Sequence, residues 1–512
     1  MKRCCLAILL FALASSVAAQ QLTETERIYL QTIELLDSTV LSQAEVEEIA
    51  APYLGRRLTF VELDRLREAL SQAYRDKGYI TSGVIVPDQR LENATVRFQA
   101  VEGQLQALHL SGNRRLADSY IESRILKNIS RPLDVNLLQD NLQQLRADPR
   151  INNVQTRLVP GRRLGDSELL VEVEENSSHH FTLGANNYRP PSVGAEQAYI
   201  TYENSNLTGW GDQLILNLGI TEGVDEIGTS YFFTFDEKGS VAYFDYQEFD
   251  SSVVEEPFDE IDLESDLKRY RLGMEYVLHR SMGGSLAASF SLERKRSSTE
   301  VLGESFSFTE GVDNGVSRLS VAQAGLLWSW RRMDRMLVLS SSYRKGLDIW
   351  NATDTSGPAD SEFESWVNQV AYAQDIPWRD SRLFMRINSQ LTRDSLLAIE
   401  KLAVGGTDTV RGYRENQYLG DNGAVLSMEL RIPLAGDYSA WTLIPFVDMG
   451  QSWNDIESSK RNLHSVGLGV QWLPNPQLSA EVYWAYSLNH VEGPDDDLQD
   501  DGLHFELLYR FN

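Results

Sequence analysis

Residues 425–434 read VLSMELRIPL, and from Leu426 to Ile432 apolar side chains alternate with polar ones at every position. The side chains of a β-strand point alternately to the two faces of its sheet. One face of this segment is therefore apolar and the other polar, with Leu426, Met428, Leu430 and Ile432 opposite Ser427, Glu429 and Arg431. The pattern predicts a strand that lies between an apolar medium and water.

The same alternation recurs along the chain after Asn176. It is clear in QLILNLGIT (213–221), SVGLGVQWL (465–473) and LHFELLYRF (503–511). We count about 16 segments of this kind, with helical periodicity absent between them. A soluble sheet with one wet face would show the same alternation, so the pattern alone does not decide the fold.

The connections between these segments alternate between short and long. The short ones include DEKG, SMGG, RMDR, AGDY and PNPQ, and the long ones span 250–267, 297–314, 350–362, 394–422 and 489–501. Outer-membrane barrels have short periplasmic turns and longer external loops. Residues 176–512 are therefore predicted to form a membrane β-barrel of about 16 antiparallel strands.

The N-terminus has the features of an export signal. MKRCCLAILLFALASSVAAQ has a basic start, an apolar stretch and small residues before Gln20. These features predict a secretory signal peptide over residues 1–19. Both cysteines, Cys4 and Cys5, lie within it, so the mature chain makes no disulfide.

The bulk properties exclude two classes of protein. The net charge of −27 argues against a nucleic-acid partner, because phosphates attract Lys and Arg. After the signal no apolar run reaches 18 residues, so no transmembrane helix is predicted. A closed β-barrel is the other structure that can span a membrane, in agreement with the strand pattern.

Between the signal and the barrel, one pattern of elements occurs twice. Residues 20–102 and 103–175 are each predicted to fold as strand, helix, helix, strand, strand. The clearest helix follows Thr59, which forms a capping box with Glu62, and Gly78 ends it. A single α+β domain without internal repetition is the alternative interpretation.

A basic and aromatic motif lies in the Gly-rich loop 394–422, which reads TVRGYREN at residues 409–416. The loop joins the predicted strands eleven and twelve, and the strand after those carries FVDMG at residues 446–450. By alternation, Phe446, Asp448 and Gly450 face the barrel lumen. An isolated charge in a confined site is costly. Arg411 would be the partner of Asp448 if the loop folds inward; an exposed loop arginine is the alternative.

These motifs resemble a known superfamily. Val410, Arg411, Gly412 and Tyr413, followed by the F-x-D-x-G strand motif, resemble the outer-membrane assembly and secretion proteins that include the BamA-type insertases. The repeated modules resemble POTRA (polypeptide-transport-associated) domains. With two such domains and about 16 strands, the chain most closely resembles the two-partner secretion transporters of the ShlB/FhaC/HecB family.

The resemblance implies an outer-membrane transporter with its POTRA domains in the periplasm. They would capture an unfolded exoprotein of haemolysin or adhesin type, which carries an N-terminal secretion domain. Capture would use β-augmentation at an edge over residues 79–86, with Tyr79, Ile80, Val84 and Ile85; an ordinary half-buried strand is the alternative there. The partner would cross the barrel without nucleotide hydrolysis.

The resemblance also implies roles for the barrel motifs. Arg411 would pair with Asp448 as a latch, with Tyr413 beside the lumen wall. Exchanging the two charges should then partly restore what each single change loses. The last strand, with Phe505, Tyr509 and Phe511, would be the signal read by the barrel assembly machinery before the barrel enters outer-membrane lipid.

Several alternatives remain from the sequence. An insertase that folds other barrels is the main one, and a passive porin is a weaker one. The histidines show no metal-binding spacing, and we expect no catalytic centre, cofactor or metal. Family members often carry a plug helix before the first POTRA domain. Here about eight residues separate the predicted cleavage site from the first strand, so loop 394–422 alone would close the lumen, or the pore rests more open.

Overall fold

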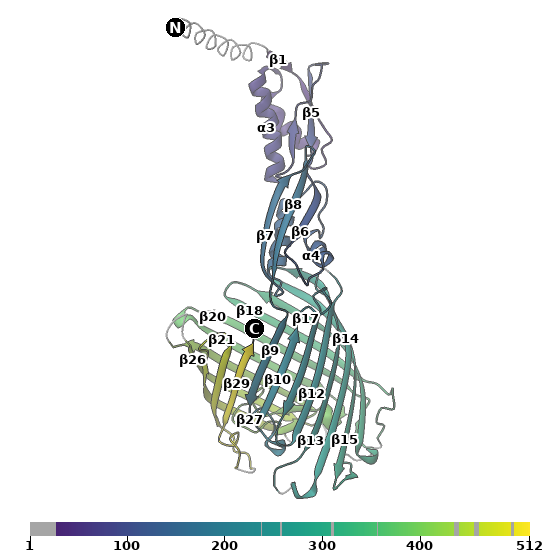
Figure 1. The fold of residues 1–512 in the computed structure, drawn as a ribbon, viewed down its shortest axis with the longest axis vertical. Helices are drawn as coiled ribbons and strands as arrows, with labels where there is room; N and C mark the ends of the chain where they lie inside the picture. The colour runs from purple at the N-terminus through teal and green to yellow at the C-terminus, as the bar shows by residue number, and fades with distance from the viewer. Residues whose placement is uncertain are drawn as a thin grey trace. The chain divides into compact units, whose positions relative to one another are not determined.

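The structure is a computed structural model that describes residues 27–512, apart from residues 237, 257–258, 309–311, 356, 435–439, 455–459, 493–495 and 512. The chain folds into two compact units, Met1–Asn176 and Ser177–Asn512, drawn in purple to blue and in blue to yellow (Figure 1). The predicted signal peptide, residues 1–19, lies outside the described residues. In the described part of the chain, no helix is both long and apolar enough to cross a membrane.

The first module has a three-stranded sheet with β5 at its centre. Strand β5 pairs in parallel with β2 and antiparallel with β4, while β1 and β3 form a separate pair. The elements are β1 Arg27–Leu30, β2 Thr32–Leu36, α2 Gln43–Ala50, the 3-10 helix η1 Ala51–Tyr53, β3 Arg56–Thr59, α3 Phe60–Asp76, β4 Gly83–Ile85 and β5 Thr95–Val101.

The second module repeats this topology. Strand β8 is central, parallel to β6 and antiparallel to β7, as β5 is to β2 and β4. The elements are β6 Gln104–Ser111, α4 Asp118–Ile125, α5 Val135–Arg146, β7 Ile151–Pro160 and β8 Asp166–Glu175. Each module has its own apolar core, so the predicted repetition of one fold is seen in the structure.

Helix α3 shows how the sequence sets these modules. Glu62 N–H donates to Thr59 Oγ1 at 3.3 Å, and Thr59 N–H donates to Glu62 Oε2 at 2.8 Å, which completes the predicted capping box. The apolar face of the helix is buried, with Leu63, Leu66, Leu70 and Tyr74 in the core of the module. Helix propensity, capping and burial therefore agree here.

The edge strand predicted over residues 79–86 is shorter than expected. Strand β4 covers Gly83–Ile85 alone, and Tyr79 and Ile80 lie in a turn, because Ser82 N–H donates to the Tyr79 carbonyl at 2.9 Å. Val84 points into the core with 2% of its surface exposed, whereas Ile80 and Ile85 are exposed. Strand β4 is at the sheet edge, and its binding role stays a prediction.

The second unit is a closed barrel, which confirms the predicted fold. Among the described residues, sixteen wall strands pair with their sequence neighbours, and β29 pairs with β9 to close the ring; the two-residue strand β16, Glu304–Ser305, extends one edge. The wall strands are β9 His179–Asn186, β10 Gln197–Asn204, β11 Gln213–Ile220, β12 Val224–Thr234, β13 Val241–Ser252, β14 Leu263–Ser281, β15 Gly284–Val301, β17 Val316–Arg331, β18 Arg335–Gly346, β20 Glu364–Ile376, β21 Ser381–Thr392, β25 Asn422–Pro433, β26 Trp441–Trp453, β27 Arg461–Trp472, β28 Leu478–Ser487 and β29 Leu503–Phe511.

Two of the predicted long loops are partly strand. Residues 250–267 and 297–314 were expected to be loops, yet β13 continues to Ser252, β14 starts at Leu263 and β15 continues to Val301. Polar cross-strand pairs such as Glu248 with Lys268 sustain the ladder beyond the apolar zone. The charged residues in these segments therefore mark where the apolar part of each strand ends, and the strand itself continues beyond that point.

The wall faces follow the alternation that the sequence predicts. In β29, His504 is fully buried on the inner side, whereas Leu507, Tyr509 and Phe511 are exposed on the outer side. In β26, Phe446 and Asp448 are buried and Trp441 and Met449 are exposed. The motif residues Phe446 and Asp448 therefore face the lumen. The assembly role of Phe505, Tyr509 and Phe511 stays a prediction.

Candidate functional site

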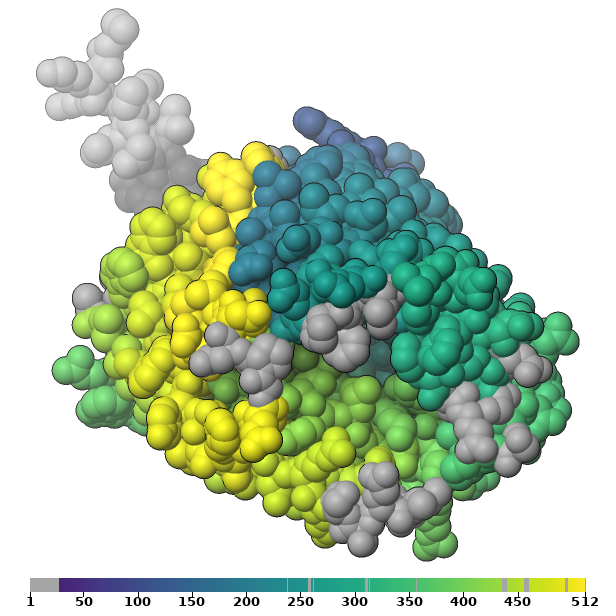
Figure 2. Space-filling model, turned by 90° about the horizontal axis from the view of Figure 1, so that it is seen from below, coloured from purple at the N-terminus to yellow at the C-terminus, as the bar shows by residue number. Residues whose placement is uncertain are grey.

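Loop 394–422 folds as a hairpin whose tip is packed inside the barrel. It contains β22 Ser395–Leu396, the 3-10 helix η6 Ala398–Glu400, β23 Leu402–Val404 and β24 Tyr418–Gly420, with β23 and β24 paired antiparallel. At the tip, Val410 and Arg411 have 0% and 1% of their surface exposed. Figure 2 looks onto the long-loop end of the barrel, which is hollowed between the teal atoms and the yellow-green atoms.

One edge of the Arg411 guanidinium group is hydrogen-bonded to both carboxylate oxygens of Asp448. Nε donates to Asp448 Oδ2 at 2.7 Å and one terminal nitrogen donates to Oδ1 at 2.8 Å. The backbone N–H of Arg411 also donates to Oδ2, at 3.2 Å. The bidentate geometry fixes the direction of the side chain as well as its charge. The structure thus brings together the two residues that the sequence motifs paired.

The arginine has further partners that the motifs did not indicate. Its other terminal nitrogen donates to Glu429 Oε1 at 2.7 Å. The terminal nitrogen that donates to Asp448 Oδ1 also donates to Ser427 Oγ, at 3.2 Å. The guanidinium carbon lies 3.6 Å from the centre of the Phe446 ring and 4.9 Å from that of Tyr483. Arg411 therefore compensates two buried carboxylates and contacts two aromatic rings.

Glycines on the wall make room for this arrangement. A Cβ at Gly467 would lie 2.3 Å from the Phe446 ring, and one at Gly469 would lie 2.5 Å from the Tyr483 ring. A Cβ at Gly450 would lie 2.5 Å from a methyl of Val404 and 2.7 Å from one of Val410. The hairpin residues Val404 and Val410 thus pack directly against Gly450, the last residue of the strand motif.

Gly412 turns the chain at the point of closest approach. Its φ of +88° is in the region that glycine adopts without strain, and a Cβ there would lie 2.9 Å from that of Ala485. Its N–H donates to His504 Nε2 at 3.2 Å, and His504 Nδ1 lies 3.2 Å from Thr407 Oγ1. His504 therefore joins the hairpin to the last strand of the barrel.

Tyr413 joins two further parts of the wall. Its side chain packs with Val404, Val410, Val425 and Leu463. Its hydroxyl oxygen lies 2.9 Å from the His464 carbonyl oxygen and 3.1 Å from that of Asn489, and it also accepts the Asn489 N–H at 3.1 Å. The four residues Val410 to Tyr413 thus contact five successive wall strands, β25 to β29, or their ends.

The two residues after Tyr413, Arg414 and Glu415, are tied to two other loops. Arg414 forms ion pairs with Glu255, Asp496 and Asp500. Gln499 Oε1 accepts the Glu415 N–H at 2.8 Å, while its amide donates to the Asn187 and Arg189 carbonyls at 2.7 Å. Some of the acidic loop residues therefore have a structural partner in the hairpin.

A second fastening lies at a different sector of the wall. Glu400, whose side chain is 0% exposed, lies 2.7 Å from Lys295 Nζ of β15 and 2.5 Å from a guanidinium nitrogen of Arg344 of β18. Beside it, Leu396 and Leu397 pack with Leu319, Val321 and Phe363. The first part of the loop is thus held by a buried carboxylate, and the tip by a buried cation.

Sequence reasoning missed most of these partners. It placed Glu429 and Ser427 on the polar face of a strand, but it gave no reason to pair them with Arg411. The available signals were Gly467 and Gly469 on the polar face of SVGLGVQWL, and His504 on the polar face of LHFELLYRF. Glu400, Lys295 and Arg344 come from segments remote in sequence, and no spacing links them.

The comparisons with known proteins agree with this architecture. The family model described as haemolysin secretion/activation protein ShlB/FhaC/HecB matches residues 165–472, more than half of the chain. A model for the ShlB-type POTRA domain matches residues 28–103, the first module.

Curated relatives match along most of their length. The outer membrane transporter CdiB of Dickeya dadantii (strain 3937) is 23% identical over 471 residues, covering 87% of this chain and 81% of its own. The heme/hemopexin transporter protein HuxB of Haemophilus influenzae (strain 86-028NP) is 21% identical, with coverage of 88% and 82%. The hemolysin transporter protein ShlB of Serratia marcescens is 24% identical, with coverage of 79% and 71%.

Two solved structures share the fold. CdiB from Escherichia coli has a TM-score of 0.68 at 19% identity and covers 96% of this chain and 91% of its own. BamA from Haemophilus ducreyi lacking POTRA domains 1–3 has a TM-score of 0.58 at 14% identity, with coverage of 95% and 100%. At these identities the likeness is one of fold.

Proposed function

The chain belongs to the haemolysin secretion/activation family ShlB/FhaC/HecB, and from that premise we propose how it moves its partner. It is an outer-membrane transporter of partner proteins, with POTRA domains of the kind that are periplasmic in its relatives. In our proposal the POTRA domains capture an unfolded exoprotein in the periplasm. The exoprotein then crosses the barrel lumen, with no reaction catalysed and no nucleotide hydrolysed.

The observation that carries the proposal is the hairpin fastened inside the lumen. Its tip is held by ion pairs and hydrogen bonds from Arg411 to Asp448 and Glu429. Such contacts are strong when complete and are lost together when the geometry changes, because a half-broken buried pair is costly. In our proposal the hairpin has two discrete positions, seated and released, and the seated one narrows the path through the lumen.

Capture at the POTRA domains needs an accessible sheet edge. Strand β4 offers Gly83–Ile85 with Ile80 and Ile85 exposed beside it. An extended segment of the partner would add to this edge through backbone hydrogen bonds, with its side chains against the exposed isoleucines. Folding of the partner outside the cell then gives direction to transport, because a folded domain does not pass back through the lumen.

The test is export of a partner encoded beside this chain. The chain and the product of an adjacent coding region are co-expressed, and that product is measured in the medium and in the periplasm. Export that depends on the chain and falls in the Arg411→Ala variant supports the proposal. If depletion of the chain instead lowers the amounts of other outer-membrane barrels while the adjacent product is unaffected, the insertase alternative replaces it.

A further inference from the structure

A row of cations crosses three neighbouring strands on the outer face of the barrel. Lys268 of β14 is directly opposite Arg296 of β15, and Arg296 is directly opposite Arg318 of β17. Arg294 is two residues before Arg296 in β15 and lies opposite Tyr270. Like charges placed opposite each other destabilise a sheet, so the row calls for a compensating anion.

The row faces outward. Its members share the alternation of Leu272, Phe290 and Leu326, which are 63%, 48% and 54% exposed. The intervening residues Glu293 and Lys295 face the lumen, where Lys295 contacts Glu400 of the hairpin. The arginines therefore extend from the surface that meets the lipid.

The row also lies at the level of the external interface. The chain enters the barrel at His179, and β9 to β13 are five strands in succession, so β14 starts at the other end of the barrel. With the POTRA domains in the periplasm, that end is external. Tyr270 and Tyr246, whose ring centres are 4.9 Å apart, lie just below Lys268, as aromatic residues do at a membrane interface.

Protein partners compensate one member of the row and leave two unpaired. Lys268 Nζ lies 2.6 Å from Glu248 and 3.6 Å from Asp266, and Arg294 donates to the Trp350 carbonyl at 3.3 Å. In the described ranges of the chain, the guanidinium groups of Arg296 and Arg318 have no ion pair or hydrogen bond. Their strands are about 5 Å apart, so both groups can reach a single phosphate.

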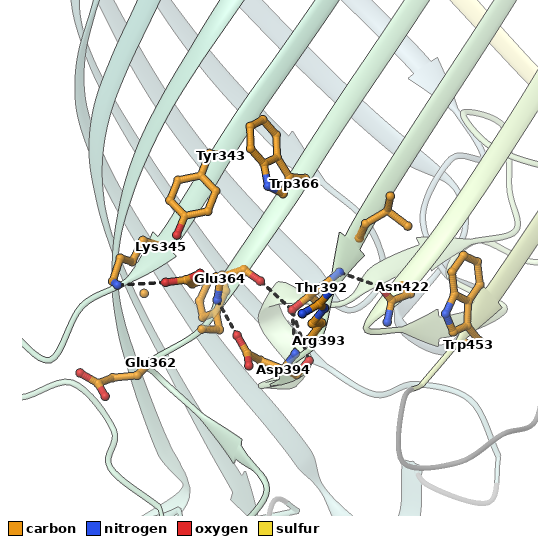
Figure 3. Close-up of a pocket in the computed structure, with 13 residues that line it drawn as sticks. Tyr343, Lys345, Glu362, Glu364, Trp366, Thr392, Arg393, Asp394, Asn422 and Trp453 are labelled. Carbon is orange, nitrogen blue, oxygen red and sulfur yellow. Dashed lines mark hydrogen bonds and ion pairs between the residues drawn. The ribbon is translucent and has the colours of Figure 1, made fainter.

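A hollow further round the wall is a weaker candidate for an anion site. It has a volume of about 900 Å³ and is lined by aromatic residues with Lys345 and Arg393 (Figure 3). Lys345 already pairs with Glu364 at 3.0 Å, and Glu362 and Asp394 also line the hollow. Three carboxylates, Glu248, Asp250 and Asp266, also cluster beside Lys268 of the row. The difference that decides between the two sites is that Arg296 and Arg318 have no protein partner among the described residues.

We propose that Arg294, Arg296 and Arg318 form a binding site for the phosphorylated headgroup of a lipid in the external leaflet. The guanidinium groups would hold a phosphate by paired, charge-assisted hydrogen bonds. The acyl chains would lie along the exposed Leu272, Phe290 and Leu326 below. The site would anchor this sector of the barrel at a fixed depth, and it does not depend on the transport proposal.

The test uses the purified full chain in detergent with bis-phosphorylated lipid A as the probe, and native mass spectrometry reports bound lipid. The same lipid without its phosphates is the comparison, and millimolar sodium phosphate is the competitor. The variant is Arg294→Gln with Arg296→Gln and Arg318→Gln. The matched control is Arg280→Gln with Arg332→Gln, which removes exposed cations at the short-turn ends of β14 and β17.

We expect the parental chain to prefer the phosphorylated lipid and the triple variant to lose that preference. At about 1 kcal/mol per cation near a lipid surface, affinity falls roughly fivefold per arginine and about a hundredfold for three. The control keeps the preference, and free phosphate does not displace the lipid. If the triple variant does not fold, Arg296→Gln alone replaces it as the test, with a smaller expected loss of lipid affinity.

Three results would overturn the site. The triple variant, or Arg296→Gln in its place, could bind like the parental chain, or the control could lose as much affinity as the triple variant. Displacement by free phosphate at equal potency would make this a general anion site and would remove the lipid assignment.

Discussion

Arg411→Ala removes the cation that Asp448 and Glu429 share in the barrel lumen. Asp448 is 0% exposed and Glu429 is 6% exposed, so both carboxylates would be left without their nearest compensating charge. Breaking a buried ion pair in this way costs about 3–5 kcal/mol. The equilibrium between seated and released hairpin would therefore shift by roughly two to four orders of magnitude, at about 1.4 kcal/mol per tenfold change.

The shift can be measured at the neighbouring residue. Val410 is 0% exposed in the seated hairpin, and the mature chain has no cysteine if the signal peptide is removed as predicted. In a Val410→Cys parent, a membrane-impermeant maleimide would label the thiol while the hairpin is released. The labelling rate is then proportional to the fraction of released hairpin. It should rise by roughly two to four orders of magnitude when Arg411→Ala is added to the Val410→Cys parent.

Arg386→Ala is the matched control. Arg386 lies 4.0 Å from Asp408, but both side chains are well exposed, and exposed pairs contribute about 0–1 kcal/mol. The labelling rate should change by less than about tenfold in that variant. Equal rates in the parent and in Arg411→Ala, with the barrel assembled in both, would refute the role of the buried pair.

Three further predictions concern the same hairpin and the first POTRA domain. Val410→Cys with Gly450→Cys should form a disulfide that holds the hairpin seated, since a Cβ at Gly450 would lie 2.7 Å from a methyl of Val410. Export of the partner should stop when this disulfide forms and return when it is reduced. Unchanged export by the oxidised variant would count against release of the hairpin during transport. Glu400→Gln should raise channel conductance and protease cleavage within residues 394–404, because Lys295 and Arg344 lose a buried partner worth about 3–5 kcal/mol, whereas Glu364→Gln, which breaks the exposed pair with Lys345, should change neither. Hydrogen bonds from Lys77 and from Ser42 lower the pKa of Glu45 from 4.5 to about 2. The stability that these bonds give α2 is therefore present above pH 4.5 and is lost as pH falls towards 2. Hydrogen exchange of the α2 amides should accelerate between pH 4.5 and 2 in the parent, and this acceleration should be absent in Glu45→Gln.

The barrel and the repeated module could be predicted because their signals are local. Alternation along Leu426 to Ile432 reports burial directly, since each side chain of a strand has one of two environments. The capping box of Thr59 and Glu62 lies within four residues and sets the start of α3 without help from the rest of the chain. Strand ends were less certain, because the ladder between β14 and β15 continues through charged pairs that look like loop in the sequence.

The candidate site depends on contacts that no local pattern contains. Arg411 and Asp448 could be proposed as partners because a family motif marks both, but Glu429, Tyr483 and His504 reach them through the side-by-side pairing of β25 to β29. Edge residues Tyr79 and Ile80 were assigned to a strand because their apolar character suits one. The chain turns there because Gly78 ends α3 with a φ of +93°, and Tyr79 N–H then bonds back to the Tyr74 carbonyl at 3.0 Å.

The structure changes what an exchange of charges should do. Sequence reasoning expected Arg411→Asp with Asp448→Arg to restore part of the lost function, as a simple pair would. Arg411 also compensates Glu429 at 2.7 Å, so an aspartate in its place would face that carboxylate. Like charges in a buried site repel strongly. In addition, the side chain of an arginine at position 448 would extend from wall strand β26 and not from the hairpin. We therefore expect no rescue from the double exchange in the labelling assay. Adding Glu429→Gln should recover part of the protection by removing the repulsion. Rescue by the double exchange alone would mean that Glu429 does not take part in holding the hairpin.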